Sequence, residues 1–131
     1  MPNILIIDDD KLVREATRTV LATKGYDVVA VEDGKAGIAA AEAGQFDLAI
    51  VDLFMPGMDG LKVIETIRRS KPNLPMIAAS GFMFGGVCPE MPNFETMAKE
   101  VGALSAIYKP FRPGILLQAV EKAIAARHKA H

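Results

Sequence analysis

Five short apolar runs divide the chain, and each is followed by a longer segment in which apolar residues recur at helical spacing. The runs lie at 4–7, 28–31, 48–51, 76–79 and 106–108. A run that is apolar at both odd and even positions is typical of a strand buried on both faces of a parallel sheet. The alternation therefore predicts an α/β fold, because right-handed crossovers leave few other arrangements for short strands joined by helices.

The segments between the runs carry the start and stop signals of helices. Helices are expected near 12–21, 35–43, 59–69, 93–101 and 112–127. Gly25 and Gly44 follow the first two as C-terminal stops, and Pro113 lies in the first turn of the last. We predict a doubly wound, five-stranded parallel sheet of order 2-1-3-4-5 with five helices.

Length and composition limit the class of protein. The 131 residues, half of them hydrophobic, are enough for one core and too few for two ordinary domains, so we expect a single domain over 1–131. A net charge of -1 gives no drive toward nucleic acid or a membrane surface. Cys88 is the one cysteine, and the chain shows neither a basic leader nor a membrane-spanning run, so we expect a cytoplasmic protein.

Polar residues follow four of the predicted strands at the ends where ligands bind in such a sheet. They are Asp8 and Asp9, Asp52, Ser80 and Lys109. Three carboxylates held together repel one another unless a cation is present. Oxygen ligands without His or Cys favour Mg²⁺ or Mn²⁺ over zinc, and Mg²⁺ commonly binds phosphate oxygens as well. This set of residues points to phosphoryl chemistry.

Each residue taken alone also has a plainer explanation. Asp9 or Asp10 could cap the first helix, Ser80 could begin a turn, and Lys109 could be a surface charge. Their joint placement at the ends of separate strands favours a functional site over these separate explanations.

The chain resembles the receiver domain of two-component response regulators, a flavodoxin-like fold, along essentially its whole length. The matching motifs are Ile-Leu-Ile-Ile-Asp-Asp-Asp at 4–10, Val-Asp-Leu-Phe-Met-Pro-Gly-Met-Asp-Gly at 51–60, Ala-Ser-Gly at 79–81 and Lys-Pro-Phe at 109–111. The resemblance implies a stand-alone domain or a piece of a larger regulator. It would receive a phosphoryl group from a sensor histidine kinase or a histidine phosphotransfer protein and act on a downstream protein target or output domain.

The resemblance also implies a role for each site residue. Asp52 would be the phosphoacceptor, and Asp8 and Asp9 would hold Mg²⁺ together with Asp52 and the backbone carbonyl of Phe54. Lys109 would contact the phosphoryl group, and Ser80 would be the hydroxyl that moves toward it as a switch. Such a domain catalyses at most its own phosphorylation and dephosphorylation, so we do not expect an enzyme.

Two positions and one segment depart from the pattern that the resemblance implies. Ala106 replaces the usual aromatic residue three positions before the lysine. Tyr108 lies on the same strand face and could partly substitute for that aromatic, although we favour a plain core or edge role.

The stretch from Ser80 to Lys109 is longer than expected, and the extra length lies in 81–92. The apolar side chains of 81–92 could pack on a partner, but we favour their folding back onto the chain's own core. We also hypothesise that this segment replaces the aromatic as the phosphorylation-sensitive element. Phe54 could hinder the water that hydrolyses an acyl phosphate, which predicts a persistent phosphorylated state.

Two other functions compete with this one. A phosphatase with an aspartyl-phosphate intermediate needs a second carboxylate two positions after its nucleophile, where this chain has Phe54. A docking module of the same fold that works without phosphorylation would not need the full set of polar residues at the strand ends. The sequence favours the phosphoacceptor, and leaves the docking module as the alternative.

Overall fold

A computed structural model describes residues 2–55, 58–80, 94–109 and 112–130. The parallel strands are β1 (Asn3–Ile7), β2 (Asp27–Val31), β3 (Leu48–Asp52), β6 (Met76–Ser80) and β7 (Ser105–Tyr108). The helices are α1 (Lys11–Thr23), α2 (Gly34–Ala43), α3 (Gly60–Ser70), α4 (Phe94–Val101) and α5 (Pro113–Ala130). Each predicted strand and helix is found, with bounds close to those expected.

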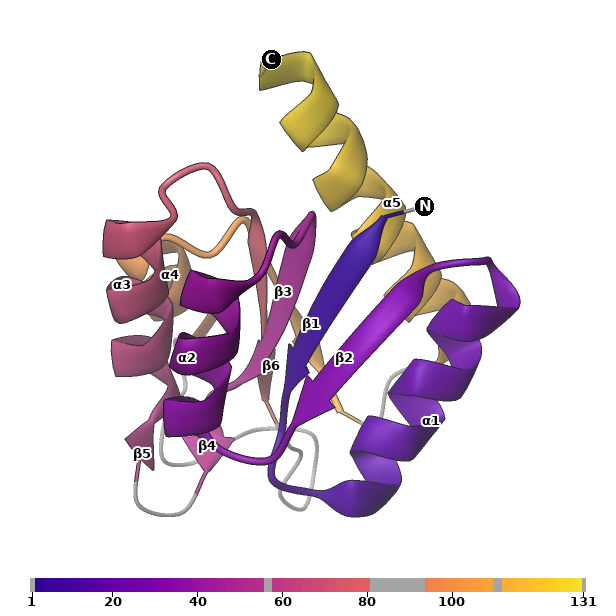
Figure 1. Cartoon of the computed structure of the whole chain (residues 1–131), viewed down its shortest axis with the longest axis horizontal. Coiled ribbons are helices and arrows are strands. Elements are labelled where there is room, and N and C mark those ends of the chain that lie inside the picture. Colours follow the sequence, from indigo (N-terminus) through magenta and orange to yellow (C-terminus); the bar gives the residue numbers. More distant parts are fainter. Residues whose placement is uncertain (1, 56–57, 81–93, 110–111, 131) are drawn as a thin grey trace.

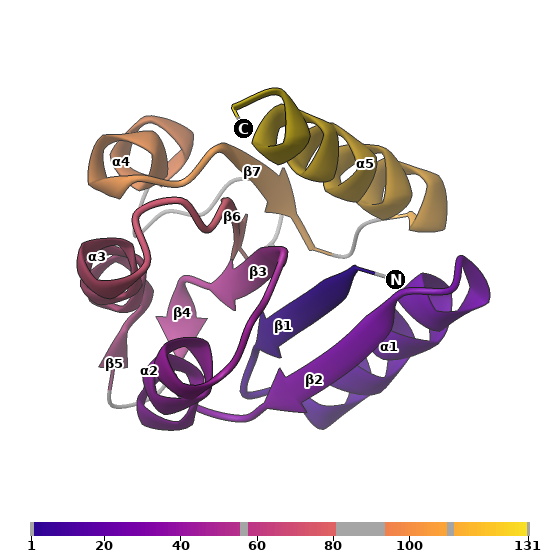
Figure 2. The same cartoon turned by 45° about the horizontal axis from the view of Figure 1, so that its top comes forward.

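The five strands form one sheet in the order β2-β1-β3-β6-β7, and every neighbouring pair is parallel. Numbered among themselves along the chain, these strands have the predicted order 2-1-3-4-5. Helices α1 and α5 cover one face of the sheet, and α2, α3 and α4 cover the other (Figures 1 and 2). The doubly wound architecture is therefore confirmed.

Two apolar clusters fill the space between the sheet and its helices. On one face Ile64 and Ile67 of α3 pack with Val51 of β3. On the other face Leu116 and Val120 of α5 pack against the sheet, as the spacing in the sequence predicts. The first helix matches its pattern less closely, because Leu12 in its first turn is 80% exposed.

Aspartates begin three of the helices. Asp10 accepts hydrogen bonds from the N–H groups of Leu12 and Val13 at the start of α1. Asp33 and Asp59 accept one such bond each at the starts of α2 and α3. These bonds satisfy N–H groups that have no partner within the helix, and so they fix where each helix begins.

One element was not expected. The segment that the sequence suggests is a turn between β3 and α3 contains a small antiparallel hairpin, formed by β4 (Phe54–Met55) and β5 (Met58–Asp59). Strands of two residues are too short to give an alternating pattern, so sequence periodicity could not reveal them. Among the described residues, none of the helices combines the length and the apolar character that a membrane span needs.

Candidate functional site

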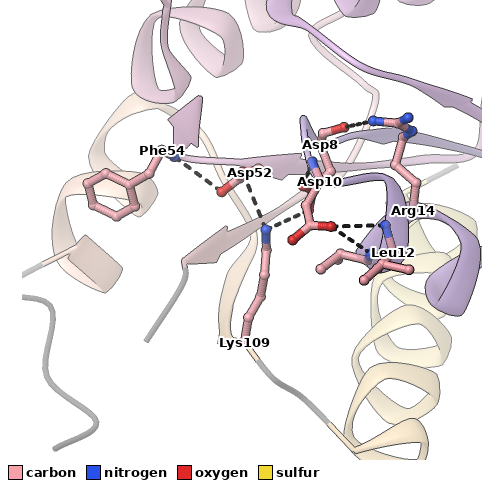
Figure 3. Close-up of polar contacts among 8 residues, drawn as sticks. Asp8, Asp10, Leu12, Arg14, Asp52, Phe54 and Lys109 are labelled. Carbon is pink, nitrogen blue, oxygen red and sulfur yellow. Dashed lines mark hydrogen bonds and ion pairs between the residues drawn. The ribbon is translucent and has the colours of Figure 1, made fainter. Parts of the chain in front are cut away.

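Three strands bring charged side chains to one point at the carboxyl edge of the sheet. Asp8 follows β1, Asp52 is the last residue of β3, and Lys109 follows β7. The side chains of all three converge (Figure 3). The structure thus brings together residues that are far apart in the sequence, as the strand ends predict.

Asp8, Asp9 and Asp52 form an acidic cluster in which one carboxylate oxygen from each lies within 4.8 Å of the others. Asp8 and Asp52 are 4% and 3% exposed, whereas Asp9 is exposed. Two of the three carboxylates are therefore shielded from water, and the third opens the cluster toward solvent.

Lys109 bridges the two buried carboxylates. Its Nζ lies 2.6 Å from Oδ2 of Asp8 and 3.3 Å from Oδ2 of Asp52 (Figure 3). The other oxygen of each carboxylate meets a backbone donor, since the N–H of Asp10 donates to Oδ1 of Asp8 at 2.9 Å and the N–H of Phe54 to Oδ1 of Asp52 at 3.2 Å. Both carboxylates are held in defined orientations.

The environment of Asp52 disfavours its charged form. Burial, above all, and then the negative charge of Asp8 raise the pKa of Asp52 from its ordinary 3.8 to about 7. A hydrogen bond with the side chain of Asp9 also raises this pKa, whereas Lys109 and the N–H of Phe54 lower it. The single ammonium group thus offsets only part of the unfavourable free energy of burying the carboxylate.

The donors of the acidic cluster fit a magnesium or manganese ion. Three carboxylates against one lysine leave the cluster with excess negative charge, and every ligand atom that it offers is an oxygen. Hard divalent cations prefer such ligands and would remove the repulsion among the carboxylates. The predicted metal site is therefore consistent with the geometry.

The structure assigns roles to two residues near the cluster. The sequence left the role of Asp10 open and gave no role to Arg14. Asp10, the third of the consecutive aspartates, caps α1 and so does not belong to the cluster. Nη1 of Arg14 donates to the backbone oxygen of Asp8 at 2.9 Å (Figure 3). The one sequence signal for this contact is an arginine in the first turn of a helix that follows an acidic loop.

The remaining predicted residues lie at the same edge. Ser80 ends β6 fully buried, and its backbone oxygen accepts a hydrogen bond from the N–H of Lys109 at 2.7 Å. Tyr108 is paired with Ser80 in the sheet register and packs, like Ala106, against the cluster under α3, as its expected place on that strand face requires. The ring of Phe54 points away from Lys109 (Figure 3) and packs against the same apolar cluster.

Two sequence-based expectations lie outside the described residues. They are the segment 81–92, hypothesised to be sensitive to phosphorylation, and Cys88 within it, the one cysteine of the sequence.

Fold and site together define a doubly wound α/β domain with an acidic cluster at the switch point of its sheet. The sequence matches the response regulator receiver domain family over residues 4–121, which is most of the chain. The chain therefore belongs to the response regulator receiver domain family, as its motifs suggest. Receiver domains are signalling domains of two-component systems and not classical enzymes; they bind Mg²⁺ at an acidic site and interact with histidine kinases and output domains.

Curated relatives support this assignment. The chain is 32% identical to the response regulator protein FleR of Pseudomonas aeruginosa over 91% of its own length and 24% of the relative. It is 33% identical to DctD of Rhizobium meliloti, a C4-dicarboxylate transport transcriptional regulatory protein, over 93% of its own length and 25% of that protein. The chain thus spans about a quarter of the length of these relatives.

Solved structures of receiver domains have the same fold as this chain. A CheY-like response regulator receiver domain protein from Methanospirillum hungatei superposes with a TM-score of 0.89 and 27% identity, covering 100% of this chain and 99% of that one. The receiver domain of NtrX from Brucella abortus gives a TM-score of 0.83 at 27% identity, covering 93% of this chain and 98% of the other.

Proposed function

We propose that this chain, a single receiver domain over 1–131, accepts a phosphoryl group on Asp52 from a phosphohistidine. The donor would be a sensor histidine kinase or a histidine phosphotransfer protein. The observation that carries the proposal is the burial of Asp52 at the carboxyl edge of the sheet, within the acidic cluster and beside the ammonium group of Lys109. A carboxylate in this setting has both an electrostatic partner for a phosphate group and a place for a cation.

In the reaction, one oxygen of Asp52 attacks phosphorus in line with the bond to the histidine nitrogen. The new P–O bond forms as the P–N bond breaks, and the histidine nitrogen keeps the electron pair and takes up a proton. The N–H of Phe54 on Oδ1 and Nζ of Lys109 on Oδ2 orient the attacking carboxylate. Lys109 then neutralises part of the charge on the transferred group, because its Nζ already lies beside Asp52.

Asp8, Asp9, Asp52 and the backbone carbonyl of Phe54 would hold Mg²⁺, with Mn²⁺ as a substitute. The bound ion supplies positive charge to the phosphoryl oxygens. Asp8 depends on Lys109 and the N–H of Asp10 for its present orientation, and Asp9 faces solvent, from which an ion would enter. The protein's own contribution is to keep these oxygens close together before the ion arrives.

The phosphorylated state would be passed on through Ser80. This residue is buried at the end of β6 and is joined by its backbone to Lys109, so a charge added at Asp52 acts within one connected edge of the sheet. We propose that its hydroxyl moves toward the phosphoryl group and that the altered surface is recognised by a downstream protein target or output domain. The proposed output is a changed binding surface, so the domain would need no substrate other than its phosphoryl donor.

The proposal is tested by measuring intact mass after incubation with phosphoramidate, a small donor that carries the P–N bond of phosphohistidine. We expect one phosphoryl group per chain with Mg²⁺ and none with EDTA. Asp52→Asn should remain unmodified, whereas the matched variant Asp33→Asn, at an exposed helix cap, should react like wild type. Modification of Asp52→Asn at the wild-type rate would refute the assignment.

A further inference from the structure

Arg14 makes a contact with the acidic loop that none of the roles above uses. It lies in the first turn of α1 and is half-buried, and its Nη1 donates to the backbone oxygen of Asp8 at 2.9 Å. Figure 3 shows its side chain reaching from the helix back to the loop that precedes it. In the part of the chain that the structure describes, Arg14 forms no ion pair with the carboxylates of the acidic cluster, so its guanidinium holds backbone rather than pairing charge.

The bonded oxygen lies one residue past the end of β1, and among the described residues no backbone N–H donates to it. The N–H of Asp8 still donates to the oxygen of Val31 on β2, but β1 ends at Ile7. Asp8 is 4% exposed, so its carbonyl needs a partner from the protein. Arg14 supplies that partner from a helix whose start is itself fixed by Asp10.

The carbonyl of Asp8 shares a rigid peptide plane with the N–H of Asp9. A bond that fixes this oxygen therefore fixes the direction in which the chain enters Asp9. Asp9 needs such control more than the other acidic residues do, because it is exposed while Asp8 and Asp52 are buried.

We propose that Arg14 is a positioning residue that orients Asp9 toward the metal through the peptide plane between Asp8 and Asp9. This inference rests on the proposed function, since it names a further residue on which the same acidic cluster depends. Arginine suits the role because its guanidinium is planar, always charged and long enough to reach back across the first turn of the helix. Loss of the contact should widen the range of positions open to the Asp9 carboxylate.

Calorimetric titration with Mg²⁺ at constant ionic strength tests the inference without any phosphodonor. Arg14→Met keeps a long side chain and removes every donor, and we expect it to weaken Mg²⁺ binding about tenfold, the size typical of residues that orient metal ligands. Arg14→Lys should restore part of the affinity. Arg18→Met, an exposed position one turn further along α1, serves as the matched control and should bind Mg²⁺ as wild type does.

Thermal unfolding of the same variants without metal separates positioning from a structural role. If Arg14 only stabilised the fold, Arg14→Met would lower Tm and leave the Kd for Mg²⁺ unchanged, and that result would overturn the inference. Where Arg14→Met does not fold, Arg14→Lys decides, since a wild-type Kd in that variant overturns the need for a guanidinium.

A wild-type protein that binds no Mg²⁺ also overturns the inference. A wild-type protein that binds Mg²⁺ but takes up no phosphoryl group refutes the proposed function alone.

Discussion

The middle of the sheet and its carboxyl edge are built from the same strands, yet burial has opposite effects in the two regions. Along β1 and β6, side chains such as Ile6 and Ile77 are buried and apolar, and their removal from water stabilises the fold. One residue past the end of β1, and at the ends of β3 and β6, the buried residues are Asp8, Asp52 and Ser80. There burial raises the pKa of Asp52 to about 7 and opposes its charged form. Burial in the middle of the sheet thus raises the free energy of unfolding, and burial of the Asp52 carboxylate at the edge lowers it.

The largest effect on stability should come from the middle of the sheet. Ile77→Ala removes a fully buried side chain from β6 and leaves a cavity, which should lower the free energy of unfolding by about 2–5 kcal/mol. Val29→Ala on β2, at a side chain that is 45% exposed, should cost less than about 1 kcal/mol. Urea denaturation of both variants measures the difference. Equal losses at the two positions would contradict the assignment of the core.

A second variant tests the boundary between the two regions. A Cβ atom on Gly60 would collide with the Cα of Leu53 and the backbone oxygen of Asp52, so helix α3 can begin this close to the acceptor only with glycine. Gly60→Ala should lower the free energy of unfolding by about 1–3 kcal/mol and also weaken Mg²⁺ binding. Gly114→Ala in the first turn of α5 meets no atom within 4 Å, and it should be neutral or stabilising by up to about 1 kcal/mol. A Gly60→Ala protein as stable as wild type would show that the helix start adjusts freely.

At the edge, removal of a charge should stabilise the protein. Without metal at pH 7, Asp52→Asn eliminates a buried carboxylate next to Asp8 and should raise Tm by about 3–8 °C, equivalent to roughly 1–2 kcal/mol for a domain of this size. Calorimetry in EDTA measures the change. The exposed residue Asp27 provides the control, since Asp27→Asn should leave Tm nearly unchanged.

The raised pKa of Asp52 also predicts the direction in which the stability of the wild-type protein changes with pH. In the folded protein Asp52 keeps its proton up to about pH 7, whereas in the unfolded chain it loses that proton near the ordinary value of 3.8. The folded state therefore binds more protons in between, and wild-type stability should fall as pH rises from about 4 to about 7. This component should be absent in Asp52→Asn. A wild-type protein that gains stability over that range, relative to the variant, would contradict the raised pKa.

The smallest expected effect concerns the lifetime of the phosphorylated state. The side chain of Phe54 offers no hydrogen bond to a hydrolytic water, and its ring packs against the apolar cluster. Phe54→Asn places an amide two residues after the acceptor and should speed loss of the phosphoryl group about fivefold, equivalent to roughly 1 kcal/mol in the barrier. The decay is followed by intact mass after the donor is removed. An unchanged rate would show that the side chain at position 54 does not control hydrolysis of the acyl phosphate.

The middle of the sheet was predictable from the sequence because its signals are local. Apolar runs specify the buried strands, and Asp59, with helical spacing after it, specifies the start of α3. The hairpin of Phe54–Met55 and Met58–Asp59 was missed because two-residue strands leave no periodic pattern. The convergence of Asp8, Asp52 and Lys109 could be predicted because parallel strands present their carboxyl ends at one edge.

The edge was less predictable in its details. Three consecutive aspartates look alike in the sequence, and only the structure distinguishes the buried Asp8, the exposed Asp9 in the acidic cluster and Asp10, which caps α1. The bond from Arg14 to the oxygen of Asp8 depends on one side-chain conformation, which no pattern encodes. The roles of Ser80, Tyr108 and the Phe54 carbonyl in switching and metal binding stay predictions, as does that of the segment 81–92.

The most direct test of the central claim is to locate the phosphoryl group. Wild-type protein is incubated with a small phosphodonor and Mg²⁺ and then reduced with borohydride, which converts an aspartyl phosphate to homoserine, and peptide mass spectrometry identifies the altered residue. The account predicts homoserine at position 52 and unmodified aspartate at 8 and 9. Modification at another aspartate would contradict it, and the absence of any modification in a folded protein that binds Mg²⁺ would favour a docking module that works without phosphorylation.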